Sequence, residues 1–166
     1  MNKLLGALYD LCGNAIERSA LIRDHPPNPR SILSTEELKM SQPTVAVIGA
    51  SSDRKKFGNK SVRAHAAQGF RVFPVNPKGG EIEGLTVYKS VQEIPVERLD
   101  RVSLYVPPAV GLALVEEIAA KGCDQLWLNP GSDSNELAER ARALGLNPII
   151  ACSIVDIGMN PRDFKA

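Results

Sequence analysis

The chain has few of the residues on which metal sites and disulfide frameworks depend. Its 166 residues include two histidines and three cysteines, and Cys12, Cys123 and Cys152 lie far apart with no C-x-x-C pair. Because a structural zinc site needs about four clustered ligands, the sequence argues against one. An odd number of scattered thiols suits a reducing compartment better than a secreted disulfide framework, so we expect a cytoplasmic protein.

The chain also lacks an excess of either charge and lacks a long apolar run. Its 20 basic residues oppose 19 acidic ones, so no general field attracts nucleic acid or an anionic membrane. No stretch approaches the roughly 20 apolar residues that cross a bilayer. Asp10 interrupts the apolar start, and no clear cleavage site for a signal peptide follows. We therefore expect neither nucleic acid nor a membrane as a partner.

Sequence motifs of catalysis are missing as well. There is no G-x-S-x-G, no Walker lysine motif and no acidic cluster suited to a metal. His65 falls within a predicted helix, where a structural role is commoner than a catalytic one. Cys152 ends the last predicted strand and could face the cleft, but a buried inert thiol is the more frequent outcome. We therefore assign no catalytic residue and no metal ligand, and the sequence leans away from an enzyme.

The first 43 residues predict a helical extension and linker before the main domain at 44–166. Apolar residues at near-helical spacing predict an amphipathic helix over residues 3–21. The segment HPPNPR at 25–30 cannot continue that helix, because successive prolines remove donors and clash with the preceding turn. Residues 34–40 predict one or two further turns. We expect a homodimer contact or a protein partner at the N-terminal helix.

From Thr44 onward, short apolar runs alternate with helical stretches. The predicted strands are 44–49, 71–76, 101–106, 124–129 and 147–152, and the predicted helices lie near 59–68, 108–121 and 133–144. Continuous runs such as VAVIG are typical of strands in a parallel sheet with both faces covered. The pattern predicts an α/β, three-layer, doubly wound Rossmann-like fold with a mainly parallel five-stranded sheet. Residues 78–95 predict a mobile glycine-rich loop at the carboxyl edge, where such sheets bind ligands.

The loop after the first strand has small residues suited to a phosphate. These are Gly49, Ala50, Ser51 and Ser52, and the helix that follows adds favourable partial charge at its amino end. The full G-x-G-x-x-G fingerprint is absent, and a tight strand-to-helix turn needs small residues even without a ligand. Both interpretations stay open on these residues alone.

The ends of three further strands add candidate contacts. The second strand ends VNPKGG, so Asn76 and Lys78 stand where NAD-binding units place an acid. They suit a phosphorylated ribose, although a proline turn with a solvated lysine fits as well. Val106 to Pro108 form an apolar ledge or an ordinary helix start. In WLNPG, Asn129 and Gly131 suit close backbone approach, whereas Trp127 is interpreted as a core residue.

Taken in order, VIGASSDRKKFGNKS, PVNPKGGEIEGLTVYKS, LYVPP and WLNPG resemble the small stand-alone coenzyme A-binding proteins. These are similar to the CoA-binding Rossmann domain of the succinyl-CoA synthetase α subunit. The resemblance covers residues 44–156, and the ordered set is more specific than any single glycine pattern. WLNPG departs from the W-x-Q-x-G of many members, which puts that wall of the pocket in doubt.

The resemblance implies coenzyme A or an acyl-CoA as the cofactor, held by the candidates above and a few more. Gly49 to Ser52 would meet the pyrophosphate, and Asn76, Pro77 and Lys78 the ribose phosphate. Lys60 and Ser61 would lie near an anion at the start of the first helix. The remaining implied contacts are the loop tyrosine Tyr88, the adenine or pantetheine flank of Val106, Pro107 and Pro108, and Asn129 with Gly131 in the opposite wall.

The function that this resemblance implies is a CoA carrier, sensor or regulatory module without ligase activity of its own. The synthetase needs a phosphorylatable histidine from a further domain, which these 166 residues do not contain. Two alternatives stay open: an NADP-dependent oxidoreductase or other nucleotide-binding enzyme, and a protein-interaction module that uses the N-terminal helix. A mixed disulfide between Cys152 and the CoA thiol is a further hypothesis.

Overall fold

The structure is a computed structural model, and it describes residues 42–166. The predicted helix at residues 3–21, the proline boundary at 25–30 and the turns at 34–40 lie outside the described residues. The predicted domain from residue 44 onward lies within them.

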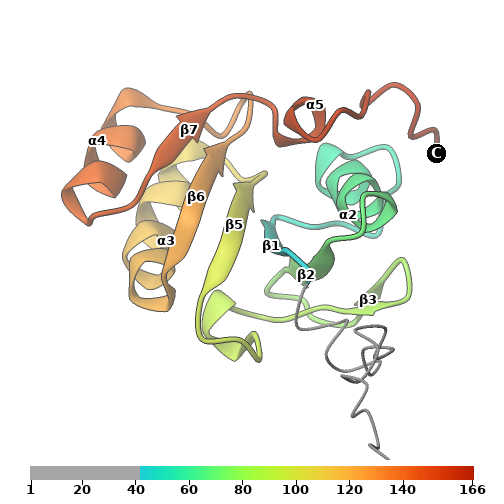
Figure 1. Cartoon of the computed structure of the whole chain (residues 1–166), viewed down its shortest axis with the longest axis horizontal. Coiled ribbons are helices and arrows are strands. Elements are labelled where there is room, and N and C mark those ends of the chain that lie inside the picture. Colours follow the sequence, from blue (N-terminus) through green and yellow to red (C-terminus); the bar gives the residue numbers. More distant parts are fainter. Residues whose placement is uncertain (1–41) are drawn as a thin grey trace, which may run out of the picture. The chain divides into compact units, whose positions relative to one another are not determined.

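A five-stranded parallel sheet forms the centre of the described domain. Its strands are β1 (Thr44–Ile48), β2 (Arg71–Val75), β5 (Leu99–Leu104), β6 (Cys123–Leu128) and β7 (Pro148–Ile150). They run in the order β2-β1-β5-β6-β7, and every pair is parallel. In Figure 1 the arrowheads of β5 and β6 therefore lie at the same end of the sheet. The predicted parallel sheet is confirmed, with strand ends shifted by at most two residues.

Helices cover both faces of this sheet. Helices α3 (Pro108–Lys121) and α4 (Asn135–Ala143) lie on one face, and α2 (Phe57–Ala67) and the short α5 (Ser153–Asp156) lie on the other (Figure 1). None of the helices within residues 42–166 is long and apolar enough to cross a bilayer. The three-layer doubly wound fold is thereby confirmed.

Alternating apolar side chains of the strands explain the two cores between these layers. Ala46, Ile48, Leu104 and Leu128 point toward α3 and α4, whereas Val45 and Val47 point toward α2, and all six are at most 3% exposed. Because β1 leads into α2 on one face and β5 leads into α3 on the other, the connections diverge between these neighbouring strands. Open α/β sheets bind ligands outside such a switch point.

Strand β2 is an edge strand, and Pro74 fits only such a position. The Pro74 carbonyl accepts a hydrogen bond from the Tyr88 N–H on the side away from β1, at 2.9 Å. The missing N–H of proline therefore points outward, where it costs no sheet hydrogen bond. The predicted mobile loop contains the hairpin β3 (Glu81–Ile82) and β4 (Leu85–Thr86), followed by a 3-10 turn at Val91–Glu93.

Candidate functional site

Two glycines shape the loop between β1 and α2. Gly49 has a φ of +84°, and a Cβ atom there would collide with the carbonyl oxygen of Tyr105. A Cβ atom on Gly58, in the first turn of α2, would collide with the carbonyl oxygen of Gly49. A dinucleotide fingerprint uses glycines for the tight turn and for close packing of helix on strand. Gly49 and Gly58 perform these two tasks here at a different spacing.

The N–H groups of this loop divide into bonded and free donors. The N–H groups of Gly49 and Ala50 both donate to the carbonyl oxygen of Val75, at 3.1 and 3.3 Å. Helix α2 begins after Lys56 without a side-chain cap. Five N–H groups of the loop and the first helical turn donate to no group within residues 42–166, namely those of Ser51, Ser52, Arg54, Phe57 and Gly58. Such unsatisfied donors at a helix start favour an anion.

The side-chain amide of Asn76 holds this loop against the end of β2. Its Nδ2 donates to the carbonyl oxygen of Ala50 at 2.8 Å, and its Oδ1 accepts from the N–H of Lys78 at 3.0 Å. The loop, Asn76 and the hairpin residue Glu81 enclose a polar cavity of about 330 Å³. Lys56 and Lys78 also line this cavity, and neither ammonium group forms an ion pair or hydrogen bond within residues 42–166.

Cavities with more apolar walls adjoin the polar one. On the α3 side, a cavity of about 210 Å³ lies against Val75, Pro77 and Val106 and also includes Gly49. On the α2 side, a cavity of about 290 Å³ passes Gly49 and Tyr105, and one of about 140 Å³ extends it. The walls of this last cavity are Phe57, Tyr105, Asn129, Pro130 and Cys152. Gly49 and Tyr105 are thus the residues at which the cavities meet.

A buried polar network fixes Tyr105 and the start of α5. Nδ2 of Asn129 donates to Oγ of Ser103 at 2.9 Å and to the Leu104 carbonyl at 3.0 Å, while Oδ1 accepts from the N–H of Ser153 at 2.8 Å. The Ser153 hydroxyl lies 2.6 Å from Oγ of Ser103 and 3.0 Å from the phenol oxygen of Tyr105. Burial raises the pKa of Tyr105, so its phenol stays neutral.

The structure brings most of the predicted site residues to these cavities. The residues that line at least one cavity are Gly49, Ala50, Ser51, Ser52, Asn76, Pro77, Lys78, Val106, Pro107, Asn129 and Gly131. Asn129 is 1% exposed, and its amide is fully engaged in the network above. Contact of these residues with a ligand stays a prediction.

Four predicted residues lie apart from these cavities. The Ser61 hydroxyl is buried beside Nδ1 of His65 at 3.2 Å, and the Lys60 ammonium lies 5.2 Å from the Phe57 ring centre. Pro108 is the first residue of α3 and lines none of the four. Tyr88 packs edge-to-face on Phe73, with ring centres 5.8 Å apart.

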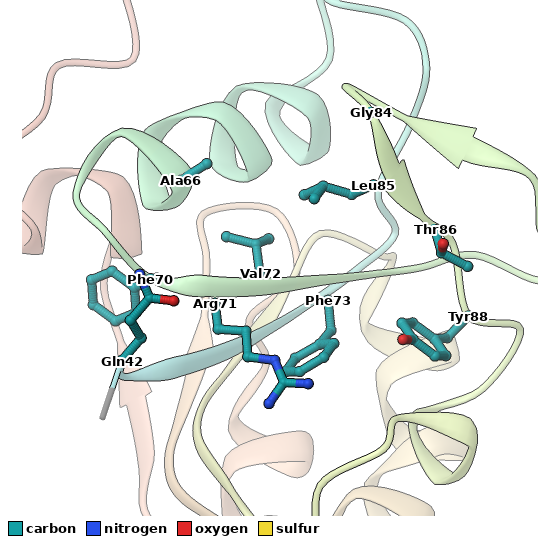
Figure 2. Close-up of a pocket in the computed structure, with 10 residues that line it drawn as sticks. All are labelled: Gln42, Ala66, Phe70, Arg71, Val72, Phe73, Gly84, Leu85, Thr86 and Tyr88. Atoms are coloured by element: carbon teal, nitrogen blue, oxygen red, sulfur yellow. The ribbon is translucent and has the colours of Figure 1, made fainter. Parts of the chain in front are cut away.

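Tyr88 instead lines a groove beside the free edge of β2 (Figure 2). The volume of this groove is about 590 Å³, which is larger than that of each cavity described above. Figure 2 shows Arg71 and Phe73 on the same side of β2 as Tyr88, and Val72 on the opposite side. The Arg71 guanidinium stacks 5.0 Å from the Phe73 ring centre. The groove is remote from the small-residue loop, and we do not assign a ligand to it.

The residues that sequence reasoning missed come from segments whose role depends on tertiary packing. Lys56 and Phe57 lie between the small residues of the loop and the predicted helix start near residue 59, and a cation before a helix start was an available signal. Tyr105 precedes the predicted ledge and lines three of the cavities. Glu117 is an acid within α3, and no sequence signal separates it from an ordinary solvated residue.

His65 and the acids give no sign of a metal site. Nδ1 of His65 lies 2.9 Å from the carbonyl oxygen of Ser61, and burial lowers the pKa of its imidazole, so the ring is neutral. The part of the chain that the structure describes contains no group of three metal-ligating side chains.

Comparison with known proteins gives one family. The model of the CoA binding domain matches residues 43–158. The α subunit of ADP-forming acetate–CoA ligase II from Pyrococcus furiosus is 41% identical over 81 residues, which are 47% of this chain and 17% of that subunit. A trans-feruloyl-CoA synthase of an unknown prokaryotic organism is 37% identical over 82 residues, which are 48% of this chain and 12% of that protein. The chain thus spans less than a fifth of the length of these curated relatives.

Solved structures of similar size are also related. A conserved hypothetical protein from Pyrococcus furiosus is 34% identical, with a TM-score of 0.61, covering 69% of this chain and 98% of that one. A hypothetical protein from Pyrococcus horikoshii is 27% identical, with a TM-score of 0.65, covering 74% of this chain and 85% of that one.

Proposed function

Because the chain belongs to the CoA-binding domain family, we propose that it binds coenzyme A or an acyl-CoA in the cleft at the carboxyl edge of its sheet. The observation that supports this best is the order of the cavities. A polar cavity with two lysines lies between more apolar cavities on either side. Coenzyme A has the same order, with its phosphates between an adenine and a pantetheine arm.

The phosphates of CoA are assigned to the polar cavity. The free N–H groups of Ser51, Ser52 and the first turn of α2 hold the pyrophosphate, and the helix start adds partial positive charge. Lys56 and Lys78 supply the charge for the pyrophosphate and the 3′-phosphate. Gly49 and Asn76 act on the loop itself, since their hydrogen bonds fix its backbone.

The two ends of CoA are assigned to the flanking cavities. Adenine lies against Pro77 and Val106 on the α3 side of the sheet. The pantetheine arm runs past Tyr105 and Gly131 on the α2 side and ends in the small apolar cavity beside Cys152. That cavity, of about 140 Å³, holds the thiol or a small acyl group.

The chain acts as a carrier, sensor or regulatory module for CoA and has no ligase activity of its own. The Asn129 amide at the thiol end is committed to internal hydrogen bonds with Ser103 and Ser153. The Tyr105 phenol is neutral and bonded to Ser153. A wall of this kind positions a ligand without offering it a general base.

Calorimetric titration of the purified, ligand-stripped protein with CoA, dephospho-CoA and NADP tests this proposal. We expect saturable binding of CoA, with a dissociation constant about tenfold higher or more for dephospho-CoA, because one charge-assisted contact is lost. Lys56→Ala and Lys78→Ala should weaken CoA binding, whereas Lys55→Ala should not, since Lys55 lines none of these cavities. Failure to bind CoA, or preference for NADP, would overturn the proposal.

A further inference from the structure

One carboxylate lies in the wall of the apolar cavity on the α3 side. Helix α3 contributes Val110, Leu114 and Glu117 to this cavity of about 210 Å³. Residues three and four apart lie on one face of a helix, so these three side chains are neighbours. The other walls are mainly apolar, with Val75, Pro77, Val91 and Val106 among them, and the polar residues Asn76, Lys89 and Ser90 complete the lining.

The Glu117 carboxylate lacks the partner that a buried acceptor normally has. Its Oε1 atom is buried and accepts no hydrogen bond from any group in residues 42–166. The neighbouring Glu116 differs, because its exposed carboxylate pairs with Arg140. The nearby amide of Gln92 donates from Nε2 to the backbone carbonyl of Glu117, at 2.8 Å, and not to its carboxylate. A buried oxygen that accepts no hydrogen bond destabilises the folded protein, and a bound ligand that donates a hydrogen bond to it removes that cost.

We propose that Glu117 accepts a hydrogen bond from the 6-amino group of the adenine of bound CoA. This rests on the proposed function and deepens it, because it names the residue that selects the base. Adenine presents two apolar faces, one exocyclic donor and ring-nitrogen acceptors, which match a mainly apolar cavity with one buried unpartnered acceptor on Glu117 and with Lys89 and Ser90 as donors. A base with a 6-oxo group would place an oxygen against the carboxylate and would be rejected.

The same residue sets the direction in which CoA lies. The cavity at the opposite end has no comparable acceptor, because Oδ1 of Asn129 already accepts the N–H of Ser153 at 2.8 Å. Adenine therefore gains a hydrogen bond only on the Glu117 side of Gly49. The thiol end is then directed toward Cys152.

The test is a cycle of two ligands and three proteins, measured by calorimetry. The ligands are CoA and an analogue whose purine carries hydrogen in place of the 6-amino group. The proteins are the wild type, Glu117→Ala and the matched control Glu116→Ala. In the wild type and in Glu116→Ala, we expect the analogue to bind about 10- to 100-fold more weakly than CoA. This difference in affinity corresponds to the loss of one hydrogen bond to a charged acceptor. In Glu117→Ala, CoA binding should weaken by a similar factor, and the two ligands should bind alike.

Several outcomes separate this inference from the proposed function. If the wild type binds CoA and the analogue with equal affinity, Glu117 does not select the base. This comparison uses the wild-type protein alone, so it does not depend on whether a variant folds. Equal weakening by Glu116→Ala and Glu117→Ala would also overturn the inference, since a general charge effect would explain both. If the wild type binds no CoA at all, the proposed function fails and this inference fails with it.

Discussion

Replacement of Asn129 by alanine separates a structural role from a ligand contact. The sequence places Asn129 in the ligand pocket, whereas the structure uses its amide to join β5, β6 and the start of α5. Asn129→Ala removes its hydrogen bonds to Ser103, Leu104 and Ser153, which have lengths of 2.8 to 3.0 Å. We therefore expect this variant to lose stability far more than it loses affinity for CoA.

The size of the loss follows from the groups left behind. The N–H of Ser153 and the carbonyl of Leu104 lose their Asn129 partner in residues that are 0% exposed. One unsatisfied buried group costs about 1–3 kcal/mol, so we expect a loss of about 3 kcal/mol in the free energy of unfolding. For a domain of this size, about 3 kcal/mol corresponds to a fall of about 10 °C in Tm.

Thermal and urea unfolding of the ligand-free protein measure this loss, with Asn135→Ala as the matched control. Asn135 is exposed at the start of α4, so its replacement should change the free energy of unfolding by less than about 0.5 kcal/mol. Calorimetry below the Tm of Asn129→Ala should then give a CoA affinity near that of the wild type. An unchanged Tm together with a large loss of CoA affinity would refute the structural role and restore Asn129 as a direct contact.

Two further predictions follow from shifted pKa values. Burial lowers the pKa of folded His65 below 6.5, so the unfolded chain binds a proton first as the pH falls below 6.5, and stability decreases from there downward. His65→Gln should flatten the dependence of unfolding free energy on pH between about 7 and 5, and an unchanged slope would contradict this. Burial raises the pKa of Cys123 to about 11, whereas Cys152 lines a cavity and is only half-buried. Peptide mass mapping should therefore find that iodoacetamide labels Cys152 before Cys123. Saturating CoA should slow the labelling of Cys152. If Cys152 is labelled at the same rate with and without saturating CoA, the thiol end of CoA does not lie where it is assigned.

The parallel fold was predictable because its strands appear in the sequence as continuous apolar runs. In TVAVI the side chains at Val45 and Val47 enter one core, and those at Ala46 and Ile48 enter the other. Both faces need apolar residues, so no alternation is visible, and this is the signature of a sheet covered on both sides. Strand ends were less predictable, since each depends on the helix or loop that follows.

The start of α2 shows how a small error in a boundary changes a predicted site. The sequence placed this start near Asn59, but the helix begins at Phe57. Residues at an anion site must lie in the first turn, where N–H groups are free. A start two residues earlier places Phe57 and Gly58 there, while Ser61 turns inward to His65. Local composition did not reveal this, because RKKFG has no strong capping residue.

Contacts from distant segments were not predictable from the sequence. Glu117 belongs to a helix whose acids all resemble solvated residues, and nothing in the sequence shows that the 3-10 turn at Val91–Glu93 packs against α3 or that Oε1 of Glu117 is buried. Cys152 differs, because its place at the end of the last predicted strand put it at the correct edge of the sheet. The geometry of parallel strands therefore predicts which edge a residue joins, but not which side chains reach inward.

The network around Asn129 also links the stability of the domain to the shape of its cleft. Tyr105 lines three cavities, and its hydroxyl is held by Ser153, which Asn129 anchors in turn. A wall fixed before binding loses little conformational entropy when the ligand arrives. The raised pKa of Tyr105 keeps this wall neutral, so it neither attracts nor repels the phosphates nearby. Under the proposed function, discrimination then depends on the polar cavity in the middle of the cleft, where Lys56 and Lys78 meet the phosphates, and on the cavity on the α3 side, where Glu117 meets a donor.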